Sequence, residues 1–507
     1  QMAHDTVTAV YQDLTPAGVH EVPRVATHVL DRKLARGITW TGGIKGTTLV
    51  ISWASFIIVA RILSPGDYGL VAMATVYLGL TAMITDFGLG NAIVALRDLS
   101  PEVTAQLHTL ALLVGGVAAA ISCLVAVPLS RFYGAPGLAM VIVVLSTSLA
   151  LDSLRIVPTA LLARELRFKA LALLESLKVL IAVAFTLALA VWGAGYWALV
   201  LGNVFAAFLV TLFVLIRLPQ RFARPKFRAL GPTLTFSSHF LAAQLAYYGY
   251  MNADFVVAGR VLGKIALGEY TLAWNLTSAL GDKIMAIFGR VMPTMLAAVQ
   301  RDVETLRRYF LLYTEALSIL IIPGSVGLSL VARDFILLVF GAKWSAAVVP
   351  AQLLCLYTAI RIPAIPTMPV LQVTRQASFP ARWCFATLAI LTPLFCVAGS
   401  RWGTVGIAAI WLSVYPLLLV PVYMRVSRTV GISLRDYAAC VGPTLVSVAF
   451  MTLIVLATRA LTPASGSLAF RFSLEVAAGA ASFVGAGLFF YRKRLGVLTE
   501  FVRTLRS

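Results

Sequence analysis

The sequence predicts an all-α polytopic membrane protein with about 14 transmembrane helices, and three observations predict it. Of the 507 residues, 60% are hydrophobic and only 12% are charged, whereas a soluble domain carries roughly 25% charged residues. Apolar stretches of about 20 residues recur along the chain, and each is long enough to cross a hydrocarbon core of about 30 Å. The stretches are continuous rather than alternating, so a membrane barrel is excluded.

The predicted spans follow one another with no loop longer than about 16 residues. The first six cover 38–61, 68–94, 107–128, 137–162, 171–192 and 195–216. The next six cover 233–259, 267–295, 309–331, 346–372, 381–400 and 404–424, and the last two cover 437–458 and 472–491. Such short loops leave no room for a soluble catalytic domain, so we expect a transporter with no catalytic residues rather than an enzyme.

The two sets of six spans repeat one another. Arg61 matches Arg260, and Asp67-Tyr68 matches Glu269-Tyr270. Three further matches follow in the same order: DFG at 86–88 with IFG at 287–289, RFYGAPG at 131–137 with VFGAKW at 339–344, and 154–166 with 360–376. Repeats in a constant order indicate a duplicated unit. Because six is even, both copies enter from the same side, which predicts two parallel six-helix lobes around a central cavity.

The repeat also sets the predicted domain boundaries. Residues 1–35 form an N-terminal segment, 36–220 the first lobe, 221–430 the second lobe, and 431–507 two extra helices with a tail. The net charge of +20 follows the positive-inside rule, with roughly 26 Lys and Arg on the side of both termini and roughly 9 on the other. We therefore expect cytoplasmic termini and no nucleic-acid partner. The five cysteines form no CxxC pair, so neither a metal site nor a disulfide framework is expected.

Charged residues inside the predicted spans each need a reason, because one at mid-membrane costs at least about 2.5–3.5 kcal/mol. Two pairs lie on one helix face at i, i+3 and are expected to neutralise each other. They are Asp152 with Arg155 and Glu175 with Lys178. Four charges have no partner within their own helix turn: Lys45, Asp86, Asp254 and Arg361. Prolines 363, 366 and 369 beside Arg361 predict a broken helix, which is tolerated where it borders a cavity.

Three segments resemble a known family. They are ARILSPGDYGLVAMATVYLGLTAMITDFGLGNAIV at 60–94, NADFVVAGRVLGKIALGEYTLAW at 252–274 and LLVFGAKWSAAVVPAQLLCLY at 337–357. Together with the predicted architecture, they resemble the polysaccharide-transporter branch of the multidrug/oligosaccharidyl-lipid/polysaccharide exporter superfamily. The resemblance covers roughly 36–430 and implies a flippase in the bacterial inner membrane. Its expected partners are an undecaprenyl-pyrophosphate-linked glycan for exopolysaccharide, capsule or O-antigen, membrane lipids and, in some systems, other polysaccharide-assembly proteins.

This resemblance suggests roles for the charges inside the membrane. Lys45, Arg155 and Arg361 come from both lobes at similar depth in the inner half, and an Arg fork suits phosphate oxygens. We expect them to border the cavity and bind the pyrophosphate. Relatives that flip the peptidoglycan precursor use cations on helices 1 and 8, which implies Lys45 again and Lys283 as a fourth member.

Two carboxylates are candidates for coupling to H⁺ or Na⁺, and no other cofactor is expected. Asp254 could hold the ion or pair with a basic side chain on the outer side, and Asp86 could hold it or pair with Lys45. Two other functions stay open: a cation-coupled multidrug exporter of the same superfamily, and a membrane glycan ligase or polymerase. An acidic cavity would favour the exporter, and the short loops disfavour the enzyme.

The duplication and the charge bias together predict the topology. Reporter fusions after Gly66 and after Lys264 should both give periplasmic signals, because each position follows the first span of its lobe. Alkaline phosphatase and green fluorescent protein fusions measure the two sides independently. A cytoplasmic signal at either position would contradict the repeat register.

Overall fold

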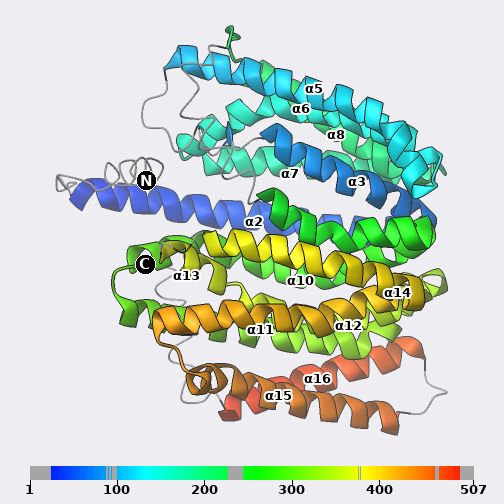
Figure 1. Ribbon diagram of the computed structural model, residues 1–507, viewed down its shortest axis with the longest axis vertical. Helices are drawn as coiled ribbons and strands as arrows, with labels where there is room; N and C mark the ends of the chain where they lie inside the picture. Colours follow the sequence, from blue (N-terminus) through cyan, green and yellow to red (C-terminus); the bar gives the residue numbers. More distant parts are fainter. Residues whose placement is uncertain are drawn as a thin grey trace.

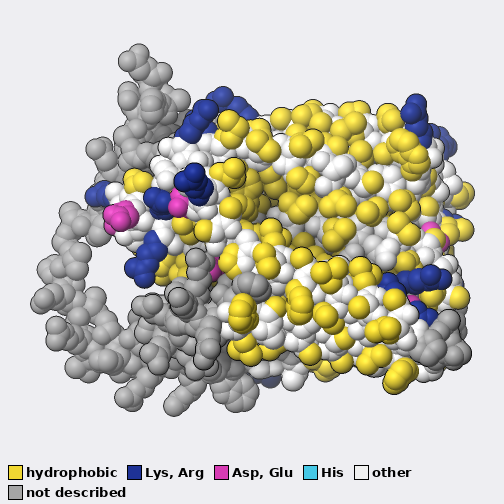
Figure 2. Space-filling view, turned by 90° about the horizontal axis from the view of Figure 1, so that it is seen from below, with side chains coloured by type: hydrophobic (Ala, Val, Ile, Leu, Met, Phe, Trp, Pro, Cys, Tyr) yellow, Lys and Arg dark blue, Asp and Glu magenta, His cyan; other side chains and the backbone are white. Residues whose placement is uncertain are grey.

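The computed structural model describes residues 24–86, 89–90, 93, 100–225, 244–374, 376, 378–462 and 467–490. These residues are almost entirely helical and contain no strand, which confirms the all-α class. Eleven helices in the described part are long and apolar enough to cross a membrane. Figure 2 shows a broad hydrophobic band on one face, with Lys and Arg gathered toward its two ends. This is the distribution expected of a surface that faces lipid between two aqueous sides.

The described residues of the first half of the chain form six long helices. They are α2 (Arg24–Ile62), α3 (Pro65–Asp86), α5 (Pro101–Tyr133), α6 (Gly137–Arg164), α7 (Phe168–Val191) and α8 (Tyr196–Arg217). Local sequence sets their ends. The Ser100 side chain accepts a hydrogen bond from the Val103 N–H at the start of α5, and Gly134 ends that helix with φ 63°, a conformation that glycine adopts without strain. Helix α2 begins 14 residues before the predicted span at 38.

The second half adds a helix over 244–257 and the elements that follow it. They are η1 (Ala258–Leu262), α10 (Gly263–Ala298), α11 (Val303–Val339), η2 (Ala342–Ala347), α12 (Val348–Arg361), η3 (Ile362–Ala364), α13 (Thr367–Val373), α14 (Ser378–Val430), α15 (Leu434–Leu461) and α16 (Leu468–Phe490). Gly403, with φ 62° and ψ −147°, divides α14 into two helical segments that match the predicted spans 381–400 and 404–424. A second break follows Arg361, where α12 ends. The prolines predict this break, because proline has no N–H to donate.

The helices lie side by side in two groups (Figure 1). Helices α2, α3, α5, α6, α7 and α8 form one group, with α2 along its boundary with the other group, which contains α10 to α14 and has α15 and α16 at its far side. Helix α2 packs on α7, and α3 packs along α10. In the extra pair, Arg459 of α15 donates to both carboxylate oxygens of Glu475 on α16 and to the Leu330 carbonyl of α11. The ion pair joins the two extra helices to each other, and the hydrogen bond to Leu330 joins them to the second group.

The two groups meet closely where α3 and α10 begin. A Cβ atom added to Gly69 would lie 1.6 Å from the Lys264 carbonyl oxygen, and one added to Gly268 would lie 1.7 Å from the Pro65 carbonyl oxygen. The contact is reciprocal, because each glycine faces a backbone carbonyl of the other helix. Gly69 and Gly268 are also separated by the same sequence offset as Arg61 and Arg260. Only residues without a side chain allow the two backbones to come this close.

Hydrogen bonds join the groups at the same end of the molecule. Arg61, in the last turn of α2, donates from Nε to the Val339 carbonyl and from a terminal nitrogen to the Leu338 carbonyl, both at 2.6 Å. In return, the Lys343 ammonium donates to the carbonyls of Arg61 and Leu63 at 2.7 Å. The Trp344 indole donates to the Ala60 carbonyl at 2.9 Å. We call Arg61, Gly69, Gly268, Lys343 and Trp344 the interlobe clasp.

Candidate functional site

A cavity of about 460 Å³ lies between the two groups. Its lining comes from one face of α2 (Lys45, Thr48, Leu49, Ser52, Trp53 and Phe56), from α7 (Glu175, Ser176 and Val179) and from α10 (Asn275, Ser278 and Ala279). The α2 residues recur every three or four positions, so they share one helix face. Along α2, Phe56 lies about 9 Å and Lys45 about 25 Å from the helix end at Ile62. The cavity therefore begins just beyond the interlobe clasp and continues away from it.

Lys45 lines this cavity and pairs with Glu175 of α7, which also lines it. The Lys45 ammonium lies 2.8 Å from a Glu175 carboxylate oxygen, with 39% and 53% of the two side chains exposed. The predicted Glu175–Lys178 pair and the alternative Lys45–Asp86 pair are therefore wrong. Asp86 is exposed at the end of α3 and has no ion pair within the described residues. The error arises because α2 packs on α7, so that a partner on the neighbouring helix is nearer than one on the same helix.

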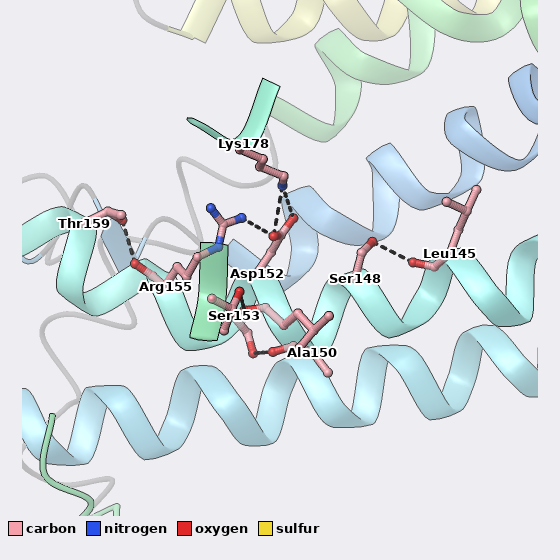
Figure 3. A network of polar contacts seen from close by, with 10 residues as sticks. Leu145, Ser148, Ala150, Asp152, Ser153, Arg155, Thr159 and Lys178 are labelled. Carbon is pink, nitrogen blue, oxygen red and sulfur yellow. Dashed lines mark hydrogen bonds and ion pairs between the residues drawn. The ribbon is translucent and has the colours of Figure 1, made fainter. Parts of the chain in front are cut away.

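A second charge cluster lies on α6 and α7 (Figure 3). Asp152 accepts from Arg155 on its own helix, which confirms that predicted pair, and from Lys178 on α7 with both carboxylate oxygens at 3.0 Å. The Arg155 Nε is buried without a hydrogen-bond partner in the described structure. Two cations share one carboxylate here, so the cluster keeps one uncompensated positive charge.

Arg361 lies in the second group, at the end of α12. Its guanidinium is within electrostatic range of Tyr247, Tyr250, Tyr357 and Tyr415, which come from the helix over 244–257, α12 and α14. Among the described side chains no carboxylate lies within 4.0 Å of it. Tyrosine hydroxyls can hydrogen-bond a guanidinium but cannot neutralise it. Arg361 is therefore a second uncompensated cation within the apolar band.

Asp254 is fully buried in the same group. Its carboxylate accepts hydrogen bonds from the Tyr270 hydroxyl at 2.6 Å, from the Trp411 indole at 2.8 Å and from the Phe255 N–H at 2.9 Å. All three donors are neutral, and the described residues provide no basic partner within 4.0 Å. The expected alternative, a pair with an outer Lys or Arg, is therefore wrong. Whether Asp254 holds an ion stays a prediction.

The structure thus separates the predicted pyrophosphate-binding residues. Lys45 lines the cavity, whereas Arg155 and Arg361 are absent from its lining. The Lys283 side chain lies outside the described residues. Sequence reasoning missed Asn275 and Trp53, which line the cavity from α10 and α2. A signal for Asn275 was present, since an amide in the middle of an apolar span usually has a polar partner or an aqueous surrounding.

The helical fold, the apolar band and the cavity between two helix groups define a multi-pass membrane protein. The family model described as "Polysaccharide biosynthesis protein" matches residues 58–349. The chain belongs to this family, which confirms the resemblance described above.

Known proteins agree with this assignment. The chain is 25% identical to the lipopolysaccharide biosynthesis protein WzxC of Escherichia coli strain K12, over 80% of this chain and 84% of that protein. It is 27% identical to the succinoglycan biosynthesis transport protein ExoT of Rhizobium meliloti strain 1021, over 76% of this chain and 78% of that protein. The fold is similar to that of the lipid II flippase MurJ in an inward closed conformation. The TM-score is 0.71 at 12% identity, over 90% of this chain and 99% of that one.

The shared carboxylate on α6 yields a stability prediction. Asp152→Asn leaves Arg155 and Lys178 close together without an anion, so the free energy of unfolding should fall by about 1–3 kcal/mol. Adding Lys178→Met should restore part of the loss, because it removes the repulsion. Thermal unfolding of the purified protein in detergent measures both variants.

Glu165→Gln provides the matched control. Glu165 pairs with Arg167 at 3.7 Å, and both side chains are more than half exposed, so its loss should change stability by no more than about 0.5 kcal/mol. If Asp152→Asn and Glu165→Gln lower the free energy of unfolding equally, the Asp152 cluster stabilises the protein no more than an exposed ion pair does.

Proposed function

We propose that this protein is a flippase of the bacterial inner membrane. It moves an undecaprenyl-pyrophosphate-linked oligosaccharide from the cytoplasmic to the periplasmic leaflet by alternating access, for exopolysaccharide, capsule or O-antigen synthesis. The observation that carries the proposal is a cavity between two helix groups with a lysine on its wall, in a chain of the polysaccharide biosynthesis family. WzxC and ExoT bear the names of proteins of polysaccharide biosynthesis and transport, and the MurJ-like fold suits the same task.

The physical problem for such a flippase is the pyrophosphate. An anion in a low-dielectric interior loses its hydration, at a cost of many kcal/mol unless it is compensated. Lys45, Arg361 and the Arg155–Lys178 cluster would supply that compensation, with Lys283 as a further candidate. Because a carrier must also release its ligand, a few separated cations serve better than one tight site. The lipid tail can stay in the bilayer while the polar head crosses.

A multidrug exporter is the second candidate, and the charges disfavour it. Its substrates are often cations, which an acidic cavity would bind. Here the Asp152 cluster and Arg361 each keep a positive charge, and Glu175 is already occupied by Lys45. A cationic ligand would meet repulsion at these positions.

Arg361 provides the first functional test. Arg361→Gln should slow flipping about tenfold or more, because one of the uncompensated cations within the apolar band is lost. Arg361→Lys should restore only part of the rate, because an ammonium keeps the charge without the bidentate fork. The measurement is the flipping of a fluorescent undecaprenyl-pyrophosphate glycan in proteoliposomes.

Arg401→Gln is the control for Arg361. Arg401 is exposed beside the break in α14, so its neutralisation should leave the rate within about twofold of the wild type. Full activity of Arg361→Gln would overturn the role of Arg361. Failure of the wild-type protein to flip the glycan lipid at all would overturn the proposed function.

Asp254 provides a test of energy coupling. A buried carboxylate without a cation, surrounded by neutral donors, is suited to hold H⁺ or Na⁺. Asp254→Asn keeps the size and most of the hydrogen bonding but cannot carry the charge. The rate at which this variant flips the glycan lipid should no longer respond to an imposed proton or sodium gradient across the proteoliposome membrane. An unchanged rate with an unchanged gradient response would exclude Asp254 as the coupling residue.

A further inference from the structure

The cavity lining changes in character along α2. Lys45 lies at one end and the aromatic residues Trp53 and Phe56 at the other, with about 12 Å of helical rise between Lys45 and Trp53. The Trp53 and Phe56 rings pack edge to face with centroids 5.5 Å apart. The cavity therefore has a charged end and an aromatic end, and the aromatic end is nearer to the interlobe clasp.

Asn275 lines the cavity from the opposite group, at a depth between those of Trp53 and Lys45 by helical rise. It lies on α10, about 18 Å along the helix from Gly263, and its side chain is exposed to the cavity. Its amide makes no hydrogen bond to any described residue, in contrast to Asn203, whose amide donates to the Leu199 carbonyl of its own helix. An unused amide at this depth is costly unless a ligand or water satisfies it.

Trp53 adds a second unused donor. Its indole N–H has no hydrogen-bond partner within the described part of the chain, whereas Trp344, Trp383 and Trp411 each donate to a protein oxygen. The Trp53 ring thus offers a flat apolar surface with a polar edge, and the two-sided hydrogen-bonding group of Asn275 lines the same cavity. Ser278 places a hydroxyl on the same wall.

These features fit a sugar ring better than any other part of a glycan lipid. A pyranose presents C–H groups on its face, which pack against an aromatic ring, and hydroxyl pairs at its edge, which match an amide. A lipid tail would cover the aromatic rings but leave the Asn275 amide unpaired. A second phosphate would find no cation among the described lining residues at this end. The volume of about 460 Å³ lies within the range of about 300–1,000 Å³ that is usual for small-ligand sites.

We propose that Trp53, Phe56 and Asn275 form a saccharide subsite that binds the sugar next to the pyrophosphate. Trp53 stacks on the ring face and Asn275 hydrogen-bonds the ring edge, while the phosphates lie toward Lys45. The inference rests on the proposed function and adds an orientation to it: the glycan enters the cavity ahead of the phosphates, toward the interlobe clasp. Because α2 and α10 belong to different groups, the sugar contacts both of them at once.

The test compares lipids with and without a sugar. Purified full-length protein in detergent is titrated with undecaprenyl pyrophosphate and with the same lipid carrying one glucose, galactose or N-acetylglucosamine. At least one sugar lipid should bind the wild type more tightly than the bare lipid. Trp53→Leu and Asn275→Ala should each weaken that binding about tenfold and change the affinity for the bare lipid less than about twofold.

Two controls match these variants. Trp402→Leu removes an exposed tryptophan outside the cavity, and Asn203→Ala removes an amide that its own helix already satisfies. Neither should change the affinity for either lipid. Trp53→Phe keeps an aromatic face without the N–H, so its loss should be smaller than that of Trp53→Leu. Retained binding of the bare lipid shows that each variant is folded.

The outcomes separate the two proposals. If no sugar lipid binds better than the bare lipid, or if both cavity variants weaken the two lipids equally, the saccharide subsite is wrong and the flippase proposal stands. If the wild type binds neither kind of lipid, the proposed function fails and the subsite fails with it.

Discussion

The contact of Gly69 with Gly268 determines how the two helix groups can be arranged. Backbone touches backbone there, so α3 and α10 approach more closely than helices with side chains at the contact could. The cavity begins a short distance beyond this contact, along α2 and α10. Its position between the groups is therefore a geometric consequence of two small residues, and the residues that line it come from both groups.

The interior charges are of two kinds. Several of them are paired with a charge on a neighbouring helix, and others have no charged partner among the described residues. Lys45 with Glu175 and Arg459 with Glu475 are pairs between helices, whereas Arg361 has only tyrosines around it. A buried pair contributes little net stability, but removal of one partner is costly. The unpaired cations are accordingly the positions where an anionic ligand would gain most.

Much of the fold was predictable because a bilayer imposes a simple length and polarity on each span. The break at Arg361 and the division of α14 follow from local chemistry, since proline lacks a donor and Gly403 adopts a positive φ. The site was less predictable. Pairing within one helix can be seen in a sequence, which is why Asp152–Arg155 was found, but the partner of Lys45 depends on how α2 packs against α7. The sequence repeat also aligned Tyr68 with Tyr270, whereas the backbones come closest at Gly69 and Gly268. The repeat alone therefore did not predict which residues make the close contact.

The hydrogen bonds of the interlobe clasp make this end of the protein sensitive to water. Arg61 satisfies carbonyls in the last turn of α11, and Lys343 with Trp344 satisfies carbonyls at the end of α2. These carbonyls have no partner within their own helices. Each helix end therefore depends on a donor from the opposite group, and separation of the groups would leave the carbonyls to be hydrated. Any separation of the groups at this end would therefore have to proceed together with hydration of these carbonyls.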